Sequence, residues 1–90
     1  MNMVSKQRHD EWADLAAAIV AQACRDYYQA LVLHYRHPEK KEPIQVIRSC
    51  ERFFRSAWFG VLCDLDPAAI LKELRAKAIR KVGRRMWDDE

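Results

Sequence analysis

The sequence predicts an all-α fold, a three-helix bundle with a long first helix. Apolar residues recur at spacings of three and four along three separate segments, which is typical of helices that bury one face. Half of the 90 residues are hydrophobic, enough for one core, and only two glycines and three prolines interrupt the chain. We therefore expect a single helical domain at residues 1–90, with helices at about 5–36, 43–62 and 66–83.

The first predicted helix begins at Ser5, which can cap its N-terminus, and ends near Pro38, because the residue before a proline is disfavoured in the α conformation. At 1.5 Å per residue it is roughly 45 Å long, so we expect one end to project beyond the core. A projecting amphipathic helix often pairs with a second copy, and Tyr28, Val32 and Tyr35 are the expected contacts of such a homodimer. The predicted core stripe comprises Trp12, Leu15, Ala16, Ile19, Ala23, Tyr27, Ala30 and Leu31.

The second predicted helix starts at Pro43, after a polar linker short enough to join antiparallel neighbours. The third starts after Asp66, an expected N-cap, with Pro67 as its first residue, and is expected to end near Gly83 because glycine lowers helix stability. The predicted core residues of the second helix are Val46, Ile47, Cys50, Phe53, Phe54, Ala57, Trp58 and Val61. Those of the third are Ile70, Leu71, Leu74, Ala78 and Val82.

Composition and motifs argue against several classes of protein. No apolar run approaches the roughly 20 residues that span a bilayer, and acidic residues stand where a signal peptide would be apolar, so we expect a cytoplasmic protein with no membrane partner. Three cysteines without a C-x-x-C pair are expected to stay reduced. The chain has no glycine-rich phosphate loop, no H-E-x-x-H motif and no nucleophile elbow. We therefore predict no enzyme, no cofactor and no metal site.

One acidic residue, Asp26, falls near the edge of the apolar stripe of the first helix. A carboxylate at such a position needs a partner, because burying it alone is unfavourable. Arg52 from the second helix is the expected partner. No second carboxylate, nucleophile or oriented base accompanies Asp26, so we interpret the pair as a structural ion pair and not as a catalytic group.

Two segments of the sequence resemble a known family. The first is A-I-V-A-Q-A at residues 18–23, followed by Asp26 and Tyr27. The second is E-R-F-F-R-S-x-W-F at residues 51–59, followed by L-C-D-L-D at residues 62–66. Together they resemble a family of small uncharacterised helical proteins encoded by phages and mobile elements of Firmicutes, with R-F-F-R-S-x-W-F as the specific motif. The resemblance implies an accessory protein of a phage or mobile element, with no catalytic residues to carry over.

The same motif places basic residues on the flank of the second helix opposite its apolar face. At about 100° per residue, three arginines and one aromatic ring fall on a stripe that could contact phosphates and stack on a base or a partner side chain. These candidate binding residues are Arg48, Arg52, Arg55 and Phe59. The alternative is a solvated face in which Glu51 pairs with Arg55 and Phe59 closes over the corner beside Leu65.

The chain has a net charge of +3, and its basic residues are concentrated on the third predicted helix. Seven basic residues and one acid lie between residues 72 and 85. A basic row with Trp87 nearby suits a polyanion. The candidate binding residues in this row are Lys77, Arg80, Lys81 and Arg84. The alternative is that these cations offset the helix dipole and keep the surface hydrated.

Two functions remain open on these grounds. The chain is predicted to be a non-catalytic protein-interaction module that docks on a host or phage protein, because arginine and aromatic residues are enriched at protein interfaces. The alternative is a nucleic-acid-binding protein that places the basic faces of the second and third helices on DNA or RNA. A helix-turn-helix reading fits poorly, since the first helix of the pair is too long and the turn at residues 64–67 has no glycine.

Overall fold

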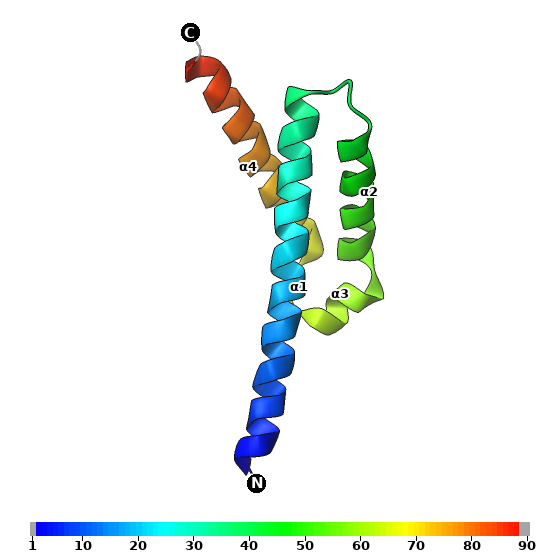
Figure 1. The fold of residues 1–90 in the computed structure, drawn as a ribbon, viewed down its shortest axis with the longest axis vertical. Helices are drawn as coiled ribbons and strands as arrows, with labels where there is room; N and C mark the ends of the chain where they lie inside the picture. Colours follow the sequence, from blue (N-terminus) through cyan, green and yellow to red (C-terminus); the bar gives the residue numbers. More distant parts are fainter. Residues whose placement is uncertain (1, 89–90) are drawn as a thin grey trace.

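Four α-helices make up the fold in the computed structural model of this chain (Figure 1). The structure describes the backbone of residues 2–88 and the side chains of residues 11–83, and the described backbone contains no strand. The helices are α1 (Asn2–Arg36), α2 (Glu42–Arg55), α3 (Ala57–Leu62) and α4 (Pro67–Asp88). The all-α prediction is confirmed, whereas the predicted count of three helices is wrong by one.

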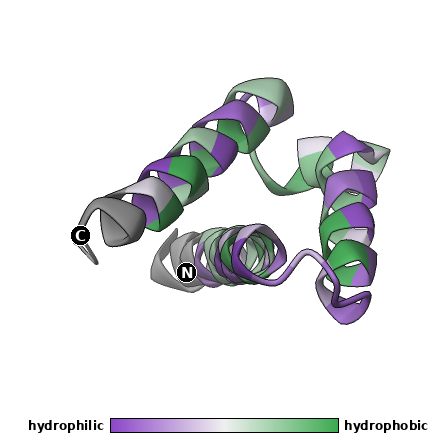
Figure 2. Cartoon of the chain, turned by 90° about the horizontal axis from the view of Figure 1, so that it is seen from above, coloured by the Kyte–Doolittle hydropathy of each residue, from purple (hydrophilic) through white to green (hydrophobic). Residues whose placement is uncertain are grey.

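The long helix α1 is the element against which the others pack. Viewed along α1, the helices α2 and α4 lie on different sides of it (Figure 2), and they make few contacts with each other. The radius of gyration is 16.6 Å, compared with about 12 Å for a compact domain of this length. The N-terminal part of α1 projects beyond the other helices (Figure 1), which confirms the expectation drawn from its length.

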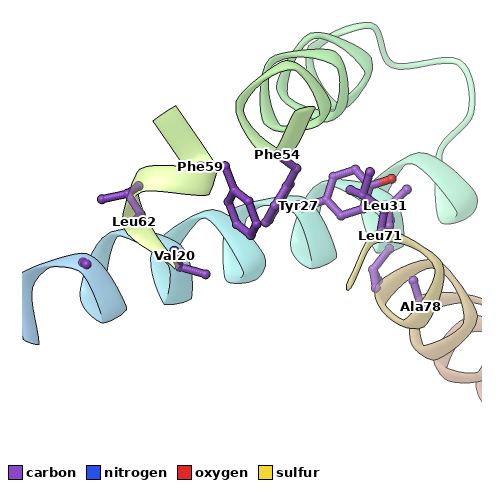
Figure 3. Close-up of a cluster of buried hydrophobic side chains, with 10 residues drawn as sticks. Val20, Tyr27, Leu31, Phe54, Phe59, Leu62, Leu71 and Ala78 are labelled. Carbon is purple, nitrogen blue, oxygen red and sulfur yellow. The ribbon is translucent and has the colours of Figure 1, made fainter. Parts of the chain in front are cut away.

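The core fills the space where the four helices meet. Three aromatic side chains lie at its centre and are almost completely buried: Tyr27 of α1, Phe54 of α2 and Phe59 of α3 (Figure 3). These rings and the half-buried Phe53 form edge-to-face pairs with centroids 5.3 to 6.1 Å apart, an arrangement that the charge distribution of aromatic rings favours. The other buried apolar residues are Ala16, Val20, Ala30, Leu31, Val32, Leu62, Leu71 and Ala78.

A break at Ser56 divides the predicted second helix into α2 and α3. Ser56 has an extended backbone, with φ −79° and ψ 157°, and its hydroxyl accepts a hydrogen bond from the N–H of Phe59 at 3.3 Å. A serine in this conformation is an N-cap, so it starts a new helix where the old one ends. The break changes which side chains face inward: Phe59 and Leu62 are buried, whereas the predicted core positions 57, 58 and 61 are exposed.

Both long helices extend further than predicted. α1 begins at Asn2 instead of Ser5, and α4 continues through Gly83 to the end of the described backbone. Glycine lowers helix stability by only about 1 kcal/mol relative to alanine, which good helix formers on either side offset. The predicted start of α4 is confirmed, because the carboxylate of Asp66 accepts a hydrogen bond from the N–H of Ala68 at 3.0 Å.

Helix α4 buries the face that its sequence predicts. Leu71 and Ala78 are buried, and Ile70, Leu74 and Val82 pack against the same core, so the predicted core residues of this helix are confirmed. The opposite side of α4 carries exposed charged residues. Over the described residues, the helices lack the combination of length and apolar content that crossing a membrane requires.

Candidate protein-interaction surface

One flank of α1 carries large apolar side chains that the core does not cover. Trp12, Leu15 and Leu33 on this flank are 42%, 53% and 46% exposed. Positions 12, 15, 19, 22, 26, 29 and 33 follow one another at alternating spacings of three and four, so they form one continuous stripe along the helix. The prediction that Trp12 and Leu15 face the core is wrong, because the core occupies the neighbouring flank, where Ala16 and Val20 are buried.

The part of the stripe from Ile19 to Leu33 forms one wall of a shallow groove whose other wall is α2. This α1–α2 groove consists of two adjoining hollows of about 330 and about 350 Å³, and Asp26 lines both of them. The first hollow is also lined by Ile19, Gln22, Ala23, Ser49, Cys50 and Phe53. The second is also lined by Gln29, Ala30, Leu33, Glu42, Pro43 and Val46.

A pair of tryptophans extends this surface on the N-terminal side of the groove. The ring centroid of Trp12 on α1 lies 6.3 Å from that of Trp58 on α3, and the ring planes are inclined by 67°. Trp58 is 48% exposed, although it was predicted to be a core residue. We use the name apolar strip for the exposed and half-buried apolar residues on this side of the molecule: Trp12, Leu15, Ile19, Leu33, Val46, Phe53 and Trp58.

The charged side chains that line the α1–α2 groove are both acidic, Asp26 and Glu42. The half-buried carboxylate of Asp26 accepts a hydrogen bond of 2.8 Å from the amide of Gln22. The predicted ion pair between Asp26 and Arg52 is wrong, because neither residue takes part in the ion pairs found among the described residues. Arg52 is exposed and lines neither hollow, and it lies about 60° around α2 from the groove residue Ser49.

A hydrogen-bonded trio, in which Tyr27 is buried and its two partners are partly exposed, joins α1, α2 and α4. The hydroxyl of Tyr27 donates to Oε2 of Glu51 at 2.9 Å, and Nη2 of Arg75 donates to the same oxygen at 2.9 Å. Nε of Arg75 also donates to the Tyr27 hydroxyl at 2.8 Å. Because this hydroxyl both donates and accepts, the polar group of the buried Tyr27 is not left without hydrogen-bond partners. Glu51 therefore hydrogen-bonds to Arg75 of α4, and not to Arg55 as the solvated-face alternative expects.

This Tyr27–Glu51–Arg75 junction shifts the pKa values of its members. Burial raises the pKa of Tyr27 to about 12, and the hydrogen bond to Glu51 adds to the rise. Burial also acts to raise the pKa of Glu51, but hydrogen bonds from Arg75 and Tyr27 outweigh it and hold that pKa below its ordinary value of 4.5. Near neutral pH the trio therefore consists of a neutral phenol, a carboxylate and a guanidinium, which together fix α2 and α4 on α1.

Three of the predicted binding residues on α2 lie where the sequence places them. Arg48, Arg52 and Arg55 are exposed along one flank of the helix, which we name the arginine row. Phe59, predicted to continue this row, is instead 1% exposed at the centre of the core, because the break at Ser56 turns α3 inward. Its position agrees with the alternative in which Phe59 closes the corner between helices.

The basic row of α4 is partly occupied by contacts within the chain. The ammonium of Lys77 lies 5.4 Å from the centroid of the Tyr28 ring on α1. Nη2 of Arg80 lies 3.8 Å from Oε1 of Glu73, and both side chains are well exposed. Lys81 is exposed, and the side chain of Arg84 lies outside the described residues.

The structure does not bring the two basic rows onto one face. Arg75 points from α4 toward α2, because it contacts Glu51. Lys77, Arg80 and Lys81 follow Arg75 by two, five and six residues, which is roughly 200°, 140° and 240° around the helix. They therefore lie on the side of α4 away from α2, and the two rows do not form one continuous groove.

The residues predicted to form a homodimer are used within the chain. Val32 is a core residue that is 8% exposed, and the partly buried Tyr28 and Tyr35 pack against the core cluster. Helix α4 covers this side of α1, as the contact of Lys77 with Tyr28 shows. The predicted contact residues are therefore already used within the chain, and a homodimer through helix α1 stays a prediction.

The three cysteines lie within the described residues and form no disulfide there. Cys24, Cys50 and Cys63 are free and half-buried. Burial raises the pKa of the Cys24 and Cys50 thiols, which keeps them protonated and poorly nucleophilic. Between residues 11 and 83, no three His, Cys, Asp or Glu side chains gather closely enough to hold a metal ion.

No protein-family model, curated protein or solved structure matches this chain. The resemblance to phage-encoded proteins therefore stays a prediction that rests on its two motifs. A function for the chain has to start from its own surfaces, of which the apolar strip is the most unusual.

Proposed function

We propose that the chain is a non-catalytic protein-interaction module, an accessory protein of a phage or mobile element that docks on a host or phage protein. The observation that carries this proposal is the apolar strip, in which large side chains from α1, α2 and α3 lie open on one side of a folded domain. Single exposed apolar residues are common on protein surfaces, but a contiguous set with polar surroundings marks an interaction site.

The chemistry of the strip supports a protein partner over a small molecule. It contains Trp12 and Trp58, and tryptophan is among the residue types most enriched where binding energy concentrates at protein interfaces. The two rings already contact each other, which reduces the side-chain entropy lost on binding. The hollows of the α1–α2 groove are shallow and open, whereas small-molecule sites enclose most of their ligand.

The test compares the wild-type chain with a double variant, Leu15→Lys with Leu33→Lys, which places two charges on the apolar strip. Both positions are about half exposed, so the fold tolerates them. In a nuclease-treated pull-down from cells that naturally produce the chain, the wild type is expected to retain a partner protein and the double variant to lose it. Arg55→Ala, at least about 120° around α2 from the residues that line the groove, is the matched control and should retain the partner. Retention that depends on nucleic acid, or survives in the double variant, contradicts the proposal.

A second candidate function is nucleic-acid binding, and the arginine row favours it. Its three guanidinium groups are exposed on one flank of α2 at spacings of four and three, separate from the basic row of α4. Three phosphate contacts on duplex DNA would give a slope of about −3 when log affinity is plotted against log salt. A salt titration with labelled DNA and RNA tests this candidate. A slope near −3 that becomes shallower in Arg52→Ala supports it, and a lack of binding at low salt excludes it.

A further inference from the structure

We propose that the α1–α2 groove binds an amphipathic α-helix of a partner protein, one whose apolar stripe carries a basic residue opposite Asp26. This inference rests on the proposed function and deepens it, because it names the element that docks and its chemistry. Three properties of the groove support it: its length, the spacing of its apolar residues and its charge.

The groove has the dimensions of a helix-binding site. Its α1 wall runs from Ile19 to Leu33, and the apolar strip continues that wall to Trp12, a stretch that in all spans about 32 Å at 1.5 Å per residue. A partner helix of about six turns covers this length. The two hollows adjoin at Asp26 and stay open to solvent, so a helix can lie along them without displacing α1 or α2. A helix laid against two packed helices completes a bundle of the ordinary kind.

The stripe on α1 has the spacing by which helices pair. Positions 12, 15, 19, 22, 26, 29 and 33 alternate three and four residues, as the a and d positions of a heptad do. Apolar side chains stand at 12, 15, 19 and 33, and polar ones stand at 22, 26 and 29. In paired helices a polar residue at such a position selects the register and the partner. A matching helix therefore has apolar residues toward its ends and a polar residue near its middle.

Charge identifies that polar residue as a cation. Asp26 lines both hollows and Glu42 lines one, whereas no basic side chain lines either. One oxygen of Asp26 accepts the hydrogen bond from Gln22, and no hydrogen bond or ion pair within the described residues uses the other oxygen. A docked helix removes water from this carboxylate, which is unfavourable unless the helix supplies a Lys or Arg in exchange.

A second copy of this chain fits the groove less well than a different protein. In a two-fold dimer the same patch meets itself, so each groove would present Asp26 and Glu42 to the acidic groove of its partner. Like charges placed together across an interface are unfavourable. The groove therefore favours a partner of opposite charge.

The test uses two synthetic helical peptides of 21 residues as probes. Both carry leucines at alternating spacings of three and four, and the central stripe residue is Lys in one peptide and Glu in the other. Fluorescence anisotropy with the full chain is expected to show at least about tenfold tighter binding of the Lys peptide, as for a hydrogen bond to a charged group. Asp26→Asn should remove most of this preference, and Arg55→Ala, on the flank of α2 away from the groove, should leave it unchanged. Circular dichroism confirms that both variants keep the helical content of the wild type.

Equal affinity for the two peptides, a preference that survives in Asp26→Asn, or no binding of either peptide overturns the inference. Photo-crosslinking in the producing cells then separates this failure from failure of the proposed function. With p-benzoylphenylalanine in place of Leu33, crosslinks to an amphipathic helix of another protein support the inference. Crosslinks to a non-helical segment of another protein overturn it and leave the proposed function standing. Crosslinks only to a second copy, or none from Leu33 and Trp58 alike, overturn both.

Discussion

Two aromatic groups in this molecule have similar ring geometry and opposite surroundings. Tyr27, Phe54 and Phe59 are at most 1% exposed, whereas Trp12 and Trp58 are 42% and 48% exposed. Both groups make edge-to-face contacts, with centroids between 5.3 and 6.3 Å apart. The difference lies in enclosure, because four helices contribute to the cluster around the first group, whereas the second is an exposed pair between α1 and α3.

This contrast shows that α1 carries more apolar surface than its own chain covers. On its covered flank even a polar group is satisfied, since the Tyr27 hydroxyl has both Glu51 and Arg75 as partners. On its open flank, apolar side chains and the half-buried Asp26 meet solvent. We expect the covered flank to determine the stability of the fold and the open flank to determine what the fold binds.

The largest expected effect is the loss of an enclosed ring. Phe54→Ala should lower the free energy of unfolding by about 3–5 kcal/mol, because it removes a fully buried side chain and leaves a cavity. Trp58→Ala, in a side chain that is 48% exposed, should lower it by less than about half that amount. Urea unfolding followed by circular dichroism measures both. Equal losses in the two variants would remove the distinction between the enclosed and the open aromatic groups.

The polar junction on the covered flank comes next. Glu51→Gln keeps the size of the side chain and removes its charge, so unfolding free energy should fall by about 1–3 kcal/mol at neutral pH. The matched control is Glu73→Gln, which breaks the exposed contact with Arg80 on α4. It should change the free energy of unfolding by less than about 0.5 kcal/mol. A control variant as damaging as Glu51→Gln would mean that the junction is an ordinary surface contact.

The same junction gives the stability a dependence on pH. The pKa of Glu51 is lower in the folded chain than its ordinary value of 4.5, so its contribution is present above pH 4.5 and is lost as the pH falls through the folded value. The pKa of Tyr27 is raised from 10.0 to about 12, so its contribution is complete below pH 10 and is lost as the pH rises toward 12. Urea unfolding measured at low and at high pH should show this loss of stability at low pH in the wild type and not in Glu51→Gln.

Much of the covered flank could be predicted from the sequence. Periodic apolar residues predict the inward face of α4, and Asp66 before Pro67 predicts its start, because both depend on local geometry that the sequence determines. Arg48, Arg52 and Arg55 are exposed as expected, since long charged side chains stay in water unless a specific partner compensates.

The junction and the open flank could not be predicted in the same way. Glu51 and Arg75 are 24 residues apart, and each reads as an ordinary surface charge until the packing of α2 and α4 brings them together. Trp12 and Leu15 have the spacing of a core stripe, but periodicity does not tell which of two adjacent flanks the remaining helices cover. The apolar run through residues 57–62 hid the break at Ser56, where a single hydroxyl caps the new helix.

That hydroxyl provides a smaller, local test of the comparison. Ser56 separates the enclosed Phe54 and Phe59 from the open Trp58, because it starts α3 in a new direction. Ser56→Ala removes the cap and should lower the free energy of unfolding by about 1 kcal/mol. Ser56→Gly, which keeps the backbone free to adopt the cap conformation, should lose only a few tenths of a kcal/mol relative to the wild type. No loss in Ser56→Ala would show that packing of Phe59, and not the cap, places the break.

The smallest expected effect on stability concerns the open pair itself. In a double-mutant cycle, Trp12→Ala and Trp58→Ala should show a coupling energy of about 0.5–1 kcal/mol, since their rings touch edge to face while solvent reaches both. If the strip binds a partner, each substitution should weaken that binding by a larger free energy than the pair contributes to folding, because a partner encloses rings that the fold leaves half open. Urea unfolding of the wild type, the two single variants and the double variant gives the coupling energy. Calorimetry on the same four proteins gives the loss of binding free energy. A coupling energy as large as the loss of binding free energy would mean that the tryptophan pair contributes to folding as core residues do.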